Sequence, residues 1–130
     1  MRAGPVIKLY LLMLVGHVAH IFEEVWGRFW LMQAVFGQGL FLIVNWMLFC
    51  IPVALFYFVL QGKRWAYSLG LAYAGLMVLN GIGHNVATIV TGRYFGGFAG
   101  GYTGLALVLI GVPLIFFLRQ AIASTSPRPS

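Results

Sequence analysis

Polar side chains that could do chemistry gather in one short segment near the start of the chain. The segment HVAHIFEE holds His17, His20 and both acidic residues of the protein, Glu23 and Glu24. Residues three or four apart lie on one face of a helix, so these side chains can act together if the segment is helical. Carboxylates and imidazoles are groups that bind metal ions or move protons. The segment is therefore the first candidate for a functional site.

A second polar pair, Asn80 and His84, occurs in the segment NGIGH with the same helical spacing of four. His20 lies 15 residues after Pro5, and Asn80 lies 15 residues after Trp65. We expect the first and third helices to begin near Pro5 and Trp65, on the same side of the protein. At a rise of about 1.5 Å per residue, His20 and Asn80 then reach the same height. The two polar pairs are predicted to share one layer.

Two histidines and a carboxylate on facing helices are what a catalytic zinc site needs, because such a site has three protein ligands and one open position. We predict His20, Glu24 and His84 as the ligands of a zinc or iron ion. Glu23 is predicted as the general base, and the catalytic set is Glu23, Glu24 and His20. A di-iron carboxylate bundle needs more carboxylates than one chain owns, so it would require ligands from a dimer. The residues predicted to contact substrate or to support the ligands are His17, Asn45, Asn80 and Tyr102.

Structural roles compete with these functional ones. Buried Glu and His side chains can pair with each other as a purely structural polar network. Asn45 and Asn80 can serve as hydrogen-bond links between helices, and Tyr102 and Thr103 can be packing residues. A charged residue inside a bilayer costs about 2.5–3.5 kcal/mol on insertion scales, which makes a functional role the default hypothesis for Glu23 and Glu24.

The composition indicates that membrane-spanning helices position these residues. Of 130 residues, 62% are hydrophobic and 8% are charged, a balance typical of a protein in a bilayer. A helix needs about 20 mostly apolar residues to cross the hydrocarbon core. We predict an all-α, polytopic bundle of four transmembrane helices in one domain, residues 1–118, with spans at about 6–26, 39–60, 65–90 and 98–118. Residues 119–130 are predicted to form a flexible polar tail.

The basic residues predict the orientation of this bundle. One side of the predicted spans carries Arg2, Lys8, Lys63, Arg64, Arg119 and Arg128, and the other carries Arg28 and Arg93. By the positive-inside rule, both termini are cytoplasmic. We expect an integral protein of the bacterial inner (plasma) membrane with membrane lipids as partners. The basic residues form no run of the kind that binds nucleic acid, so no nucleic-acid partner is expected.

Glycines recur at small-x-x-x-small spacing around the start of the fourth predicted span. Gly96, Gly100 and Gly104 follow this spacing, with Gly97 and Gly101 beside them. Such steps let helices approach closely. We predict a packing role for them, and association of the chain into a homo-oligomer through the same steps.

The stretch His20-Ile21-Phe22-Glu23-Glu24 resembles the HXXEE-domain family of small integral membrane proteins. The stretch Asn80-Gly81-Ile82-Gly83-His84 is similar to that family's second motif, and the resemblance extends from the first predicted span through the fourth. It implies a compact multi-helix membrane domain with a metal or catalytic site at His20, Glu23, Glu24, Asn80 and His84. His17 lies outside the named motif, and the resemblance implies no particular reaction.

These patterns together predict a membrane-embedded, metal-dependent enzyme that acts on a lipophilic small molecule or lipid. Bound zinc or iron would activate water or polarise a carbonyl. Without a metal, the same residues could catalyse an isomerisation or cyclisation by moving protons. The alternative class is an ion or proton transporter or binding protein that uses the same cluster. A conducting path needs polar groups on both sides of the site, whereas the cytoplasmic halves of the predicted spans are almost wholly apolar.

Overall fold

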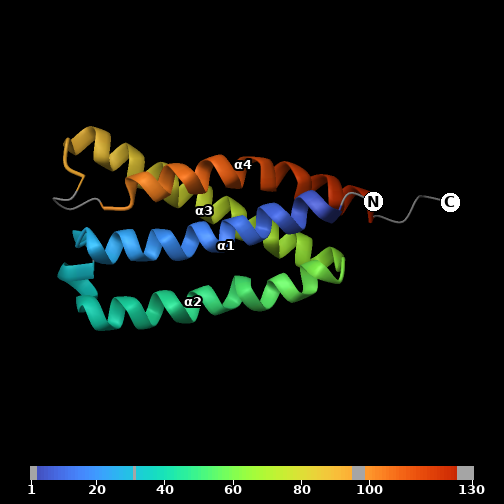
Figure 1. Ribbon diagram of the computed structural model, residues 1–130, viewed down its shortest axis with the longest axis horizontal. Helices are drawn as coiled ribbons and strands as arrows, with labels where there is room; N and C mark the ends of the chain where they lie inside the picture. Colours follow the sequence, from blue (N-terminus) through green and yellow to red (C-terminus); the bar gives the residue numbers. More distant parts are fainter. Residues whose placement is uncertain (1–2, 31, 95–98, 126–130) are drawn as a thin grey trace.

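The chain folds into long helices that run back and forth along one axis. A computed structural model describes residues 3–30, 32–94 and 99–125. Within these ranges there are four α-helices and one short π-helix: α1 (Ala3–Trp26), η1 (Met32–Phe36), α2 (Gly37–Leu60), α3 (Arg64–Thr91) and α4 (Gly101–Ser124). Successive α-helices run in opposite directions, so α1 begins and α4 ends at the same end of the bundle (Figure 1).

Each α-helix of the described chain is long and apolar enough to cross a membrane. α1, α2 and α4 have 24 residues each and α3 has 28. These lengths correspond to about 36 to 42 Å, which exceeds the hydrocarbon thickness of about 30 Å. The predictions of an all-α fold and of four helices of membrane-spanning length are confirmed. Their length and composition indicate an integral membrane protein.

The fourth helix differs from its predicted bounds at both ends. It begins at Gly101 instead of residue 98, which lies outside the described residues, and it continues through Ser124. Residues 119–124 are therefore helical, contrary to the predicted flexible tail. The helix extends because Ala121 and Ile122 pack against the hydrophobic core. Residues 126–130 of the predicted tail lie outside the described residues.

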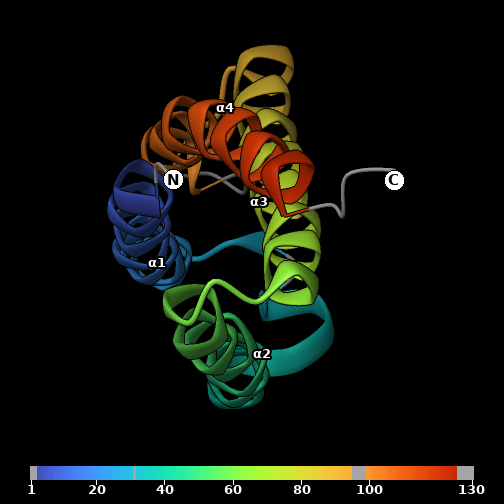
Figure 2. The ribbon, with the colours of Figure 1, turned by 90° about the vertical axis from the view of Figure 1, so that its right-hand side faces the viewer.

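α3 and α4 make the most extensive helix contact in the described bundle, and Figure 2 shows them crossing one another. Gly81 of α3 faces Gly104 of α4 so closely that a Cβ atom added at Gly81 would collide with the Gly104 carbonyl oxygen. In the same way, a Cβ atom at Gly111 would collide with the side chain of Val78. Glycine at these positions lets the two backbones approach. Association of copies through Gly104 would have to displace this intrachain contact.

The hydrophobic core lies toward the end of the bundle where α1 begins and α4 ends. Tyr10 and Met13 of α1 are fully buried there against Leu114 and Leu118 of α4. The hydroxyl of Tyr10 donates a hydrogen bond to the carbonyl of Pro52 at 3.2 Å, which ties α2 to α1. The buried polar residues lie toward the opposite end of the bundle.

Candidate metal centre and cavity

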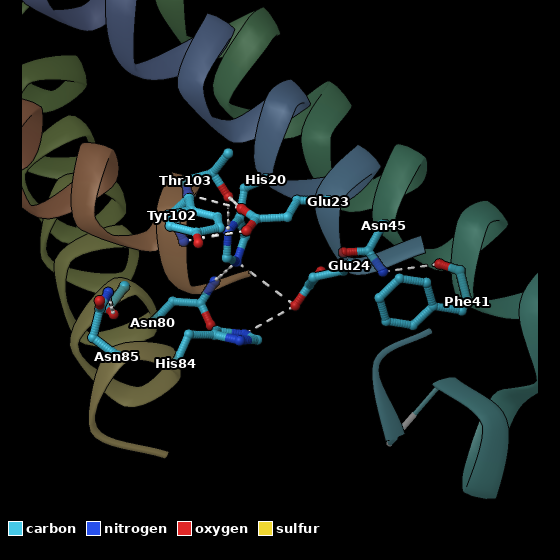
Figure 3. Close-up of polar contacts among 11 residues, drawn as sticks. His20, Glu23, Glu24, Phe41, Asn45, Asn80, His84, Asn85, Tyr102 and Thr103 are labelled. Atoms are coloured by element: carbon cyan, nitrogen blue, oxygen red, sulfur yellow. Dashed lines mark hydrogen bonds and ion pairs between the residues drawn. The ribbon is translucent and has the colours of Figure 1, made fainter. Parts of the chain in front are cut away.

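Near the opposite end of the bundle, the side chains of His20, Glu24 and His84 meet between α1 and α3 (Figure 3). Glu24 Oε1 lies 3.0 Å from His84 Nε2 and 3.6 Å from His20 Nε2. The exposed fractions of His20, Glu24 and His84 are 1%, 6% and 6%. All three residues offer ligand atoms within 4.8 Å of one another. The structure therefore brings together the three residues that the sequence predicts as metal ligands.

The imidazole and carboxylate donors of this set are of the kind that binds zinc or iron, and the two separations from Glu24 Oε1 suit a tetrahedral ion. Imidazole nitrogen and carboxylate oxygen bind zinc at about 2.0–2.2 Å, so two ligand atoms of a tetrahedral site lie about 3.4 Å apart. The separations of 3.0 and 3.6 Å from Glu24 Oε1 lie on either side of this value. Three protein ligands leave one position for water or substrate, as in catalytic zinc sites.

His20 is held at both of its ring nitrogens. Asn80 donates from Nδ2 to His20 Nε2 at 2.9 Å, and His20 donates from Nδ1 to the hydroxyl of Thr103 at 2.8 Å. That hydroxyl donates in turn to the carboxylate of Glu23. The contact between Asn80 and His20 confirms the prediction that they lie in one layer. A partner at the second ring nitrogen fixes the tautomer and orientation of a ligating histidine.

Glu23 points away from the cluster, toward the first turn of α4 (Figure 3). Its carboxylate accepts hydrogen bonds from the backbone N–H groups of Tyr102, at 3.1 Å, and Thr103, at 2.7 Å. The first N–H groups of a helix lack partners within the helix and carry partial positive charge, so a carboxylate there is stabilising. Glu23 is thus occupied as the cap of α4 and is not the free base that the sequence predicts. Glu24 is the carboxylate that lines the cavity.

Tyr102 lies outside the cavity, although the sequence places it among the substrate contacts. Its side chain is 74% exposed, and its ring packs against Tyr94 with a centroid distance of 4.4 Å. The neighbouring Thr103 is the α4 residue that reaches the cluster through its bond to His20. Thr103 is not among the predicted site residues, and packing is the interpretation that the sequence favours for it.

The other predicted supporting residues line the cavity together with the cluster. They are His17, Asn45 and Asn80. Nδ1 of His17 lies 3.1 Å from the hydroxyl of Tyr73, one helical turn farther from the cluster than His20. Asn45 donates to the carbonyl of Phe41 in its own helix at 2.9 Å. These three residues come from α1, α2 and α3, and their roles as substrate contacts or supports stay predictions.

The cavity has a volume of about 780 Å³ and is bounded by α1, α2 and α3. Its lining includes the cluster and Asn45 at one end, and Phe58 and Trp65 at the other. Between these ends the walls are mainly apolar side chains of α2 and α3. A volume of this size falls within the range of about 300–1,000 Å³ that is typical of small-molecule sites.

Two residues that the sequence analysis missed shape the polar end of the cavity. Phe29, between α1 and η1, lines the cavity and packs its ring on His84 with a centroid distance of 4.9 Å. Gly100 precedes α4 with a φ of +108°, and a Cβ atom there would lie 2.8 Å from both His20 Cε1 and His84 Nδ1. The positive φ and the closeness of both rings favour glycine. Phe29 carries no distinctive signal in the sequence, and the small-x-x-x-small spacing at Gly100 predicts only packing.

No protein family model, no curated protein and no solved structure matches the chain. The class of protein therefore comes from its own fold and site. It is a bundle with four helices of membrane-spanning length in its described part, and it carries a buried His/Glu cluster at one end of a cavity. The resemblance to the HXXEE-domain family stays a prediction from the motif residues.

Proposed function

We propose that the protein is a membrane-embedded, metal-dependent enzyme that acts on a lipophilic small molecule or lipid. The observation that carries this proposal is the meeting of His20, Glu24 and His84 at the polar end of a largely apolar cavity. Zinc or iron, when bound, would supply Lewis-acid activation of water or of a substrate carbonyl. The rest of the cavity offers apolar surface to the substrate.

In this proposal, the surrounding residues set the geometry of the cluster. Thr103 orients the His20 imidazole through its Nδ1, whereas Asn80 would have to release Nε2 for a metal ion to bind there. Glu24 would hold the ion together with the histidines, and in this proposal it is also the carboxylate that accepts a proton from a group in the cavity. Phe29 covers His84 and limits access of water from that side.

The proposed orientation places both chain ends in the cytoplasm. Lys8 near the start of α1, Lys63 and Arg64 between α2 and α3, and Arg119 near the end of α4 belong to one end of the bundle. Arg28, after α1, belongs to the other. By the positive-inside rule, the end with more basic residues faces the cytoplasm. The cluster then lies in the outer half of the membrane, for which we propose the bacterial inner membrane.

Metal content tests the proposal directly. Protein purified in detergent without chelator, and again after reconstitution with zinc or iron, is measured by elemental analysis. Wild type is expected to hold the metal near-stoichiometrically, whereas His20→Ala and His84→Ala lose it. His17→Ala is the matched control because it removes a cavity histidine one turn away from the cluster, and it should keep the metal. Helicity by circular dichroism verifies that each variant is folded.

Two results would overturn the metal assignment. One is a wild-type protein that stays metal-free after reconstitution, and the other is retention of the metal by folded His20→Ala and His84→Ala. Loss of metal from all three histidine variants alike would instead indicate a diffuse site, which also contradicts the proposed ligand set.

One observation favours a second candidate, metal-free acid–base catalysis of an isomerisation or cyclisation. The Nδ2 group of Asn80 donates to His20 Nε2, which is the nitrogen whose lone pair a metal ion would need. In that arrangement, the ion pair between Glu24 and His84, at 3.0 Å, is the proton-transferring couple. Elemental analysis of Asn80→Ala separates the two candidates. A metal-dependent enzyme should keep its metal in this variant, whereas a metal-free catalyst binds none in either form.

Ion or proton transport has less support from the lining of the cavity. A transport path needs polar groups along its length. The polar side chains of the lining gather toward one end, whereas the other end is formed by residues such as Ala54, Phe58, Trp65 and Leu69.

A further inference from the structure

The cavity is long and narrow. Its lining on α3 extends from Trp65 to His84, which spans about 28 Å at the helical rise. The volume of about 780 Å³ is distributed along that length. Phe58 packs on Trp65 with a centroid distance of 4.8 Å and marks the far end. These proportions suit an extended chain better than a compact ring system.

The cavity also opens sideways along the line where α2 faces α3. Several side chains that line it are at the same time exposed on the outside of the bundle. Leu48 and Ile51 of α2 are 57% and 64% exposed, and Leu69 and Leu76 of α3 are 55% and 63% exposed. In a bilayer this exposed apolar surface faces hydrocarbon. A ligand can therefore enter from the membrane without crossing the bundle.

The charges of the lining limit the head group of such a ligand. The described residues around the cavity include no lysine or arginine, and Glu24 is the one acidic residue among them. In the absence of a bound metal ion, whose positive charge would attract anions, a phosphate or free carboxylate would meet Glu24 without a basic partner from the protein. An uncharged hydroxyl or ester can hydrogen-bond to the imidazoles and amides at this end.

We propose that the groove between α2 and α3 binds an uncharged single-chain amphiphile, such as a long-chain alcohol or its ester, with the head group at the His20–Glu24–His84 cluster and the chain extending toward Trp65. The inference deepens the proposed function, because it names the substrate class, and it rests on that function for the role of the head group. Ala72 lies on α3 between Leu69 and Leu76, and its small side chain leaves the middle of the groove open.

Photo-crosslinking of hexadecanol that carries a diazirine at its terminal carbon tests the proposal. Wild-type protein in lipid nanodiscs is irradiated with this probe, and the adducts are mapped by peptide mass spectrometry. Adducts are expected around Phe58, Trp65 and Leu69, and excess unlabelled hexadecanol should compete with their formation. A probe with the diazirine beside the hydroxyl should instead label the end of the groove near Phe41 and Asn45.

Ala72→Phe is the variant that should close the groove. It should lower labelling at Trp65 by about tenfold or more, because the added ring fills space that the chain needs. Ala123→Phe adds the same side chain on an exposed part of α4 and should leave the labelling unchanged. In protein without bound metal, the matching fatty acid probe should label the groove less than the alcohol. A two-chain phospholipid probe should not produce competed groove adducts.

The proposal would be overturned by adducts that spread over the outer surface, for example at Leu109 of α4, and that excess unlabelled hexadecanol does not reduce. It would also be overturned by equal labelling of the groove by a phospholipid probe, by equal labelling of the metal-free protein by the fatty acid probe, or by unchanged labelling of Trp65 in folded Ala72→Phe. Metal content measured on the same samples keeps the two proposals apart. If a metal-free protein shows groove adducts that depend on the probe position and that excess hexadecanol suppresses, only the metal centre is contradicted. If a metal-loaded protein shows no groove adducts, only the proposed ligand is contradicted.

Discussion

The two faces of α3 show how one helix can serve as a rigid support and as the wall of a binding site. On the face toward α4, Gly81 brings the backbones of the two helices together, with Gly104 as its partner. On the face toward α2, larger side chains such as Leu69 and Leu76 line an open groove. Small residues allow helices to approach closely, whereas the larger side chains on the other face stay exposed along the groove. Asn80 and His84 are therefore presented to the cavity from the more firmly packed pair of helices.

We expect the largest effect on stability from a substitution that disrupts the contact between α3 and α4. Gly81→Ala should lower the free energy of unfolding by about 3 kcal/mol or more, because the added Cβ collides with the Gly104 backbone, which cannot move aside as a flexible side chain can. Thermal unfolding in detergent, followed by circular dichroism, measures this. Gly83→Ala on the same helix is the control. Its Cβ would meet nothing within 4 Å, and the better helix propensity of alanine should leave stability unchanged or raise it by up to about 1 kcal/mol. Equal destabilisation by Gly81→Ala and Gly83→Ala would contradict the packing role of Gly81.

The next largest effect distinguishes the roles of the adjacent residues Glu23, which faces α4, and Glu24, which faces the cavity. Glu24→Gln should weaken metal binding more than about 100-fold, because it removes a charged ligand. Glu23→Gln should change metal affinity less than about tenfold and instead lower the free energy of unfolding by about 1.5–3 kcal/mol, since its carboxylate caps α4. Competition with a chromogenic chelator gives the affinities, and thermal unfolding gives the stabilities. The reverse pattern would show that the roles of the two carboxylates are exchanged.

The smallest effect concerns the link between α4 and the cluster. Thr103→Val keeps the shape of the side chain and removes the hydroxyl that bonds to His20 and Glu23. We expect a loss of about 1 kcal/mol in stability and of about tenfold in metal affinity, because the His20 ring loses its orienting partner. Thr103→Ser restores the hydroxyl and should recover most of both quantities. If Thr103→Ser binds metal as weakly as Thr103→Val, the methyl group and not the hydrogen bond is responsible.

Much of the candidate site could be predicted because helix geometry converts sequence spacing into spatial position. Apolar runs of sufficient length predict the four long helices. The spacing of four between His20 and Glu24 predicts their common face, and equal distances from the helix starts predict that Asn80 reaches His20. These inferences need only the rise and period of a regular helix. The same reasoning predicts that His84 lies near Glu24, because His84 shares a helix face with Asn80.

The predictions fail where the outcome depends on how one helix is rotated against another. Glu23 and Glu24 are neighbours in the chain, and a helix turns about 100° between them, so one faces α4 and the other faces the cavity. The spacing alone fits either assignment. Similarly, Tyr102 and Thr103 are adjacent, and only the crossing of α4 over α3 decides that Thr103 reaches His20.

The sequence by itself determined that the described chain has four long helices and that His20 and Asn80 share one height, because these follow from local periodicity and from the apolar composition of each run. Only the tertiary structure decided which carboxylate faces the cavity, that Glu23 caps α4, that Phe29 and Gly100 enclose the histidines, and that a groove remains between α2 and α3. Those outcomes depend on contacts between residues far apart in the chain, such as the 80 residues between Glu23 and Thr103. Contacts of that kind are set by the packing of whole helices, where a glycine on one face and a leucine on another fix the rotation and separation of the pair.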